Sequence, residues 1–128
     1  MGKIYTALGL MSGTSMDGVD ASIISSTDGI EYDEKFNRYF EYDKGLYQKI
    51  SSIRDKIFTS QDLKKLSKEL KSLEKEITLF HAKVVNDVNH SVKKSTVSTP
   101  EIIGFHGQTI FHNPKEKISV QLGDGKLL

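Results

Sequence analysis

The chain has no cysteine among its 128 residues, which excludes a disulfide, a thiolate metal site and a cysteine nucleophile. An excess of one charge is also lacking, because 18 Lys and Arg are balanced by 17 Asp and Glu, for a formal net charge of +1. Such a balance provides neither a basic field for nucleic acid nor an acidic one. No apolar run approaches the ~18 residues of a transmembrane helix. We therefore expect a cytoplasmic protein with no nucleic-acid or membrane partner.

Two apolar runs, 4–8 and 19–24, enclose a dense group of small, hydroxyl and acidic residues. This pattern predicts a strand, a tight turn and a second strand. Such a turn offers backbone N–H groups and hydroxyls to phosphate oxygens, since glycine lets the backbone approach closely. Asp17 and Asp20 supply the oxygen ligands that Mg²⁺ prefers. An ordinary hairpin with an Asp-Gly turn at Asp17 and Gly18 explains the composition equally well.

A second informative stretch, residues 102–114, is an apolar strand that runs into polar residues flanked by glycine. We expect His106, Gln108 and Thr109 where this buried strand reaches the surface, a common place for ligand-binding groups in α/β folds. The residues alone favour a simpler interpretation of His106, as a histidine at a strand end that is bonded to the backbone.

Together these stretches resemble the anhydro-N-acetylmuramic acid kinases. Residues 9–20 carry the complete family signature G-x-M-S-G-T-S-x-D-G-V-D, and residues 104–112 carry G-x-H-G-Q-T-x-x-H. Residues 119–124 are similar to the family's next strand, T-x-Q-x-G-D. The resemblance implies an enzyme that adds water across the 1,6-anhydro bridge of the sugar. It also implies transfer of the γ-phosphoryl of ATP to O6, which gives N-acetylmuramic acid 6-phosphate in cell-wall recycling.

The resemblance implies ATP and Mg²⁺ as cofactors, with Asp17 as the metal ligand. The ATP-binding residues that it implies are Gly13, Thr14, Ser15, Met16, Asp17, Gly18, Val19 and Asp20. On the sugar side it implies His106, Gln108 and Thr109, whose polar groups suit a polyol or an anhydro ring. Asp124 is a weaker candidate, because residues 123–125 also read as a plain turn.

The chain departs from the family in its length. Family members are much longer, and their general-base aspartate belongs to a D-F-R motif expected beyond Leu128. We therefore expect one domain over 1–128, the first lobe of a kinase, with no catalytic residue of its own and no activity alone. Self-association or a complementary C-terminal half is expected. The alternative is a non-catalytic relic, or a nucleotide- or partner-binding module that oligomerises through its long helix.

The periodicity predicts strands over 4–11, 19–26 and 30–42, then helices, then strands from 102 and over 118–122. A capping box from Thr59 to Asp62 opens a long helix through residue 88, with His81 and His90 at its surface or partly buried. Apolar heptads also suit a coiled coil, but packing on the sheet is favoured because flanking strands need a cover. The order β-β-β-α-α-β-β is an α/β (α+β) arrangement. It resembles the ribonuclease-H-like first lobe of the actin-like, hexokinase-like superfamily.

Overall fold

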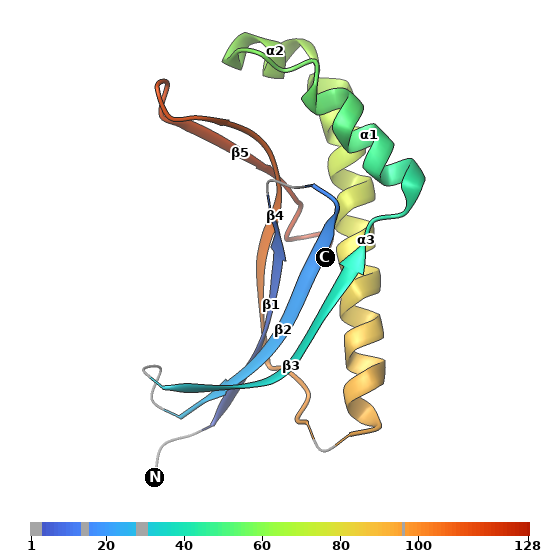
Figure 1. Ribbon diagram of the computed structural model, residues 1–128, viewed down its shortest axis with the longest axis vertical. Helices are drawn as coiled ribbons and strands as arrows, with labels where there is room; N and C mark the ends of the chain where they lie inside the picture. The colour runs from blue at the N-terminus through green and yellow to red at the C-terminus, as the bar shows by residue number, and fades with distance from the viewer. Residues whose placement is uncertain (1–3, 14–15, 28–30, 96) are drawn as a thin grey trace.

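The computed structural model describes residues 4–13, 16–27, 31–95 and 97–128. A five-stranded sheet carries a layer of helices on one face (Figure 1). The elements in chain order are β1 (Tyr5–Ser12), β2 (Gly18–Ser26), β3 (Tyr32–Glu41), α1 (Lys44–Arg54), α2 (Ser60–Lys65), α3 (Ser67–Lys93), β4 (Ile102–Asn113) and β5 (Ile118–Leu122). The predicted strands are thus confirmed within a few residues at each end.

The sheet has the order β3-β2-β1-β4-β5. The first three strands form an antiparallel meander, and β4 then pairs with β1 in parallel. β5 returns antiparallel to β4 through a hairpin, which the turn residues Asn113 and Pro114 indicate in the sequence. A mixed α/β architecture is confirmed, whereas the likeness to the ribonuclease-H-like lobe stays a prediction. Thr27, Asp28 and Gly29 are a turn signal in the sequence, and the last two of them lie outside the described residues.

The core lies between α3 and the inner face of the sheet. Every buried apolar residue of α3 falls on one stripe, namely Leu70, Leu73, Ile77, Val84, Val88 and Val92. The opposing buried strand residues include Leu8, Leu10, Val19, Ala21 and Ile23. Because the stripe is already covered by the sheet, the packing prediction is confirmed over the coiled-coil alternative. Removing this apolar area from water is the main favourable term in folding.

The prediction of one unbroken helix from Thr59 is wrong at a single residue. Leu66, with φ −99° and ψ 16°, separates α2 from α3. One residue outside the helical region leaves the three-and-four spacing intact, so periodicity does not reveal the break. The capping box itself is confirmed, since Asp62 Oδ2 accepts hydrogen bonds from the backbone N–H groups of Phe58 and Thr59 at 2.9 and 3.0 Å. These bonds lower the pKa of Asp62.

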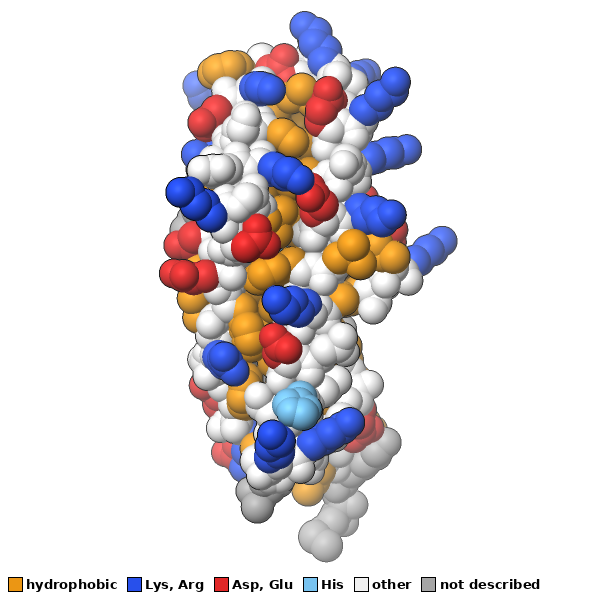
Figure 2. Space-filling view, turned by 90° about the vertical axis from the view of Figure 1, so that its right-hand side faces the viewer, with side chains coloured by type: hydrophobic (Ala, Val, Ile, Leu, Met, Phe, Trp, Pro, Cys, Tyr) orange, Lys and Arg blue, Asp and Glu red, His pale blue; other side chains and the backbone are white. Residues whose placement is uncertain are grey.

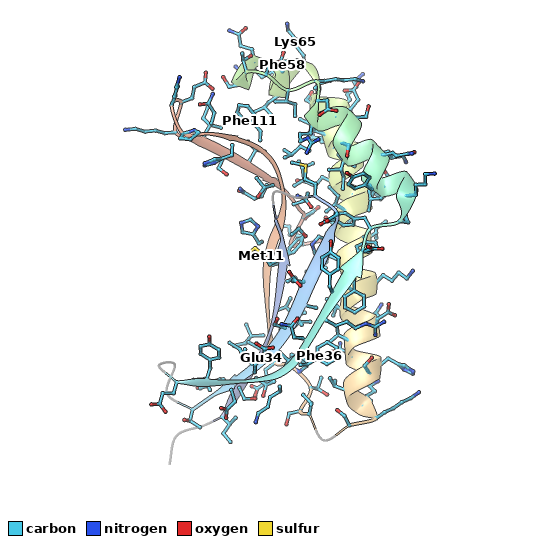
Figure 3. The ribbon with its side chains drawn as sticks, in the orientation of Figure 1. Met11, Glu34, Phe36, Phe58, Lys65 and Phe111 are labelled. Atoms are coloured by element: carbon cyan, nitrogen blue, oxygen red, sulfur yellow. The ribbon has the colours of Figure 1, made fainter. Side chains whose placement is uncertain are left out.

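The two faces of the molecule differ. Lysine, arginine and acidic side chains intermingle on the helical face, with a strip of apolar side chains running lengthwise among them (Figure 2). This mixture supports a solvated surface. On the opposite face Met11 points away from α3 (Figure 3), and Tyr5, Met11 and Ile102 are 48%, 54% and 53% exposed. None of the helices in the described part of the chain is long and apolar enough to cross a membrane.

Candidate functional site

The two sequence signatures meet at one end of the sheet, where β1 lies beside β4. Parallel pairing places Gly9 opposite Gly104 and Leu10 opposite Phe105. One step further, Ser12 is the register partner of Gln108. β1 ends at Ser12 while β4 continues to Asn113, so the start of the β1–β2 turn lies against the polar middle of β4. The β1–β2 turn and the polar part of β4 therefore form a single site.

A register shift in β4 decides which side chains face the helices. Leu10 pairs with Phe105, and Ser12 pairs with Gln108. Between these two pairs β1 advances by two residues, whereas β4 advances by three. The extra residue lies next to Gly107, whose φ of +81° suits glycine. A Cβ on Gly107 would lie 2.6 Å from the carbonyl oxygen of Leu122. The bulge turns both Phe105 and Gln108 toward α3, although simple alternation would put them on opposite faces.

Four polar side chains form a buried network beneath the β1–β2 turn. Ser12, His81 and Gln108 are fully buried, and Tyr42 is 6% exposed. The Tyr42 hydroxyl lies 2.9 Å from Gln108 Oε1 and 3.2 Å from Ser12 Oγ. Ser12 Oγ lies 3.0 Å from His81 Nε2. We call these four residues the buried network. It joins β1, the segment after β3, α3 and β4.

The ends of the turn are held by this network and by backbone bonds. The Gln108 side-chain amide donates to the carbonyl oxygens of Gly13 and Thr109, at 2.8 and 3.0 Å. The Gly13 carbonyl also accepts from the N–H of Met16 at 3.2 Å. At the far end, the N–H of Tyr42 donates to the carbonyl of Asp17 at 2.9 Å. Thr14 and Ser15, both predicted to bind ATP, lie outside the described residues.

The tautomer of His81 follows from its two neighbours. Its Nδ1 lies 2.8 Å from the carbonyl oxygen of Ile77, which can only accept, so Nδ1 carries the proton. Nε2 is then the acceptor for the hydroxyl proton of Ser12. Burial lowers the pKa of His81, although the bond to Ile77 opposes this shift. Phe105 packs edge-on against the ring at 5.0 Å. His81 is thus a neutral, oriented imidazole.

Asp17 lies on the outer side of the turn and is held by Tyr39. The Tyr39 hydroxyl donates to Asp17 Oδ1 at 2.6 Å. Burial and this bond to a carboxylate both raise the pKa of Tyr39, as do the charges of Asp17, Glu41 and Asp20. The Tyr39 ring covers Gly18, where a Cβ would lie 2.6 Å from the ring and 2.4 Å from the carbonyl of Phe40. Only glycine leaves room for this arrangement.

The model of the anhydro-N-acetylmuramic acid kinase family matches residues 5–128. The chain belongs to this family. It is 54% identical to the anhydro-N-acetylmuramic acid kinase of Pelagibacter ubique, over 100% of this chain and 33% of that relative. The kinase of Agrobacterium fabrum is 37% identical over 100% of this chain and 34% of its own length. The kinase of Rhodospirillum rubrum is 38% identical over 95% of this chain and 30% of its own length. The chain thus spans about a third of the length of these curated relatives.

The remaining family-signature residues fall into two groups. The side chains of Met16 and Val19 are buried, at 6% and 0% exposure, so only their backbone groups can reach a ligand. Gly13 and Asp20 are exposed. Met16 has φ +60°, an uncommon conformation outside glycine. The predicted roles of Gly13 to Asp20 in ATP binding stay predictions.

Of the predicted sugar-side residues, His106 lines a surface hollow. This hollow of about 440 Å³ includes Gly9, Asp20, Ser22, Gly104 and His106 in its lining. His106 Nδ1 lies 3.1 Å from the carbonyl of Gly107, in keeping with the backbone-bonded alternative. The expectation that Gln108 reaches the surface is wrong, because the bulge turns it inward. Thr109 is half-buried. The sugar-binding roles of all three stay predictions.

The described part of the chain contains no group of three or more His, Asp or Glu residues suited to hold a metal ion. Asp17 is nevertheless a fitting single ligand, because Mg²⁺ in kinases takes one or two carboxylates and completes its shell with phosphate oxygens and water. Asp17 is exposed, which leaves room for both.

Sequence reasoning missed two members of the buried network, Tyr42 and His81. Tyr42 reads as one of several strand aromatics, and the prediction of His81 at or near the surface is wrong. A signal for His81 exists, since it follows Ile77 by four residues and precedes Val84 by three. A histidine in the middle of an apolar stripe, with an amphipathic helix around it, indicates a buried hydrogen-bonded side chain.

Proposed function

We propose that this chain is the phosphate-binding part of an ATP-dependent kinase for anhydro-N-acetylmuramic acid. The complete reaction adds water across the 1,6-anhydro bridge and transfers the γ-phosphoryl of ATP to the freed O6, giving N-acetylmuramic acid 6-phosphate. The observation that carries the proposal is the β1–β2 turn, whose two ends are tied to the second family signature and to Tyr42. A cytoplasmic location in cell-wall sugar recycling goes with this reaction.

Phosphoryl transfer depends mainly on positioning and on neutralising charge on the transferred group. In our proposal the backbone N–H groups of the turn bind phosphate oxygens. Asp17 would hold Mg²⁺, which would supply positive charge to offset the negative charge of the phosphates. The hydrogen bond from Tyr39 fixes one carboxylate oxygen of Asp17, so that its second oxygen has a defined direction. His106 and Thr109 lie on the sugar side, and Gln108 supports the turn from the interior.

The proposal is tested by titrating Mg-ATP into the chain and measuring affinity by calorimetry. Asp17→Asn removes the charge that would face Mg²⁺, and we expect about tenfold weaker binding or more. Asp33→Asn is the matched control, because Asp33 is an exposed residue of β3. Equal binding by all three proteins would contradict the assignment of Asp17. No binding by the unsubstituted chain would contradict the proposed phosphate site.

We further propose that activation of water is supplied by an aspartate outside these 128 residues, as the resemblance implies. Incubation of the chain with Mg-ATP and 1,6-anhydro-N-acetylmuramic acid, followed by mass spectrometry, then yields no sugar phosphate. Product at ordinary turnover would show that the base lies within the chain.

A second candidate function is protein association through the outer face of the sheet, with a second copy or a complementary half. Tyr5, Met11 and Ile102 favour it, because large apolar side chains on one face promote contact with a partner. Association through α3 is disfavoured, since its apolar stripe is already buried. Light scattering tests this: Met11→Gln should reduce a concentration-dependent increase in mass, and a constant monomer mass would exclude it.

A further inference from the structure

Tyr42 contacts both ends of the β1–β2 turn with two different groups. Its backbone N–H donates to the carbonyl of Asp17 at 2.9 Å, where the turn ends. Its hydroxyl lies 3.2 Å from Ser12 Oγ, where the turn begins, and 2.9 Å from the Gln108 oxygen. The amide of Gln108 in turn holds the Gly13 carbonyl. One residue therefore sets the separation between the two ends.

The hydrogen bonds of the buried network have a defined order. The Ile77 carbonyl fixes the proton on His81 Nδ1, and the free Nε2 takes the proton of Ser12. The Tyr42 hydroxyl donates to two acceptors, Gln108 Oε1 at 2.9 Å and Ser12 Oγ at 3.2 Å, and the bond to Gln108 is the shorter one. Gln108 then presents its amide N–H groups to Gly13 and Thr109. Within the described residues, no buried side-chain polar atom lacks a partner.

Filling a core with such a network costs free energy. Apolar side chains of similar size would pack there without the cost of removing polar groups from water. A fully satisfied network instead imposes one orientation on each member. Here that orientation reaches the carbonyl of Gly13 and, through the backbone of Tyr42, the carbonyl of Asp17. Both residues belong to the proposed phosphate site.

We propose that Tyr42 and His81 are positioning residues that hold Gly13 and Asp17 in the geometry that binds the phosphates of ATP. This inference rests on the proposed function and goes beyond it, because neither residue belongs to a family signature identified above. Neither touches the ligand. His81 orients Ser12 from α3, and Tyr42 spans the turn, so that the long helix and the nucleotide site act as one rigid unit.

The first experiment compares Tyr42→Phe with Tyr47→Phe, an exposed tyrosine of α1. We measure the dissociation constants of Mg-ATP and of Mg-tripolyphosphate by calorimetry. Loss of the Tyr42 hydroxyl should weaken the binding of both ligands by the same factor, about threefold to tenfold. The factor is the same because the hydroxyl positions the groups that contact the phosphates, which both ligands share. Tyr47→Phe should bind both ligands as the unsubstituted chain does.

Hydrogen exchange of the ligand-free proteins gives a second measurement. The amides of residues 16 and 42 close the turn, and in Tyr42→Phe we expect both to exchange about tenfold faster by local opening. The amides of Val84 and Val88 in the core should exchange at unchanged rates. A structural role alone would accelerate exchange throughout the chain.

The second variant is His81→Phe, with His90→Phe on the exposed side of α3 as its control. Removal of the acceptor for Ser12 should weaken the binding of Mg-ATP and speed hydrogen exchange of the amide of residue 16. His90→Phe should change neither. In the unsubstituted chain, Mg-ATP should shift the ring nitrogen resonances of His81 and leave those of His90. A ring protonated at Nε2 rather than Nδ1 would overturn the proposed order of bonds.

The outcomes separate the inference from the proposed function. If the unsubstituted chain binds Mg-ATP and the Tyr42 and His81 variants bind equally well, the inference is overturned and the phosphate site stands. If the unsubstituted chain does not bind, the phosphate site fails. Exchange then decides whether Tyr42 and His81 hold the turn: local acceleration supports it, and unchanged or global rates overturn it.

Discussion

Ser12 and Gln108 are register partners on adjacent parallel strands and are both fully buried. Each comes from a different family signature, and the Tyr42 hydroxyl lies within 3.2 Å of a polar atom of each. The pairing of β1 with β4 thus does more than complete a sheet. It turns two separated stretches of sequence into one support for the β1–β2 turn, with His81 behind it.

The bond between Ser12 and His81 should appear as an energetic coupling. In a double-mutant cycle of Ser12→Ala and His81→Phe, measured by urea unfolding, we expect a coupling of about 1 kcal/mol, because the two groups share one buried hydrogen bond. A cycle of Ser25→Ala with His81→Phe is the control and should show none. Additive effects of Ser12→Ala and His81→Phe would contradict the bond.

The stability of the chain should depend on pH through His81. Its pKa in the folded state is lowered by burial, whereas in the unfolded chain it is about 6.5. Below about pH 6.5 the imidazole of His81 binds a proton in the unfolded state but not in the folded state, so the free energy of unfolding falls as the pH falls. The limiting slope is about 1.4 kcal/mol per pH unit.

The measurement for His81 is urea unfolding between pH 7.5 and pH 5. In His81→Phe the free energy of unfolding should lose the part of its pH dependence that comes from His81, and in His90→Phe it should keep that part. A slope that is the same in the unsubstituted chain and in His81→Phe would show that His81 titrates normally in the folded state.

Gly18→Ala should destabilise the chain by about 1–3 kcal/mol, because the added Cβ meets the Phe40 carbonyl and the Tyr39 ring. Gly125→Ala is the matched control, since no heavy atom lies within 4 Å of its added Cβ. Chemical unfolding measures both. Equal stability of the two variants would mean that Tyr39 does not cover Gly18.

Ile77→Ala should cost about 2–5 kcal/mol, because Ile77 is fully buried between α3 and the sheet. Leu79→Ala, at a position 50% exposed on the same helix, should change stability by about 0.5 kcal/mol or less. If Ile77→Ala instead left stability unchanged and altered only the oligomeric mass, α3 would be an association surface rather than part of the core.

Much of the fold could be predicted because it depends on local patterns. Two apolar runs on either side of a polar turn predicted β1 and β2, and three-and-four spacing predicted α1 and the stripe of α3. The capping box at Thr59 was visible because both of its partners lie within four residues. The break at Leu66 was not, since a local change of backbone angles leaves the spacing of the leucines unchanged.

The sequence by itself determined the family, the strand–turn–strand around Asp17 and the apolar stripe that covers the sheet. These depend on residue type and on neighbours a few positions away. Only the tertiary structure decided that Gln108 faces inward and that His81 is buried beneath Ser12. The bulge at Gly107 reverses the alternation of β4, and parallel pairing brings α3, β1 and β4 to one point. Contacts between groups far apart in the chain produce no periodic pattern in the sequence, so the sequence alone does not predict them.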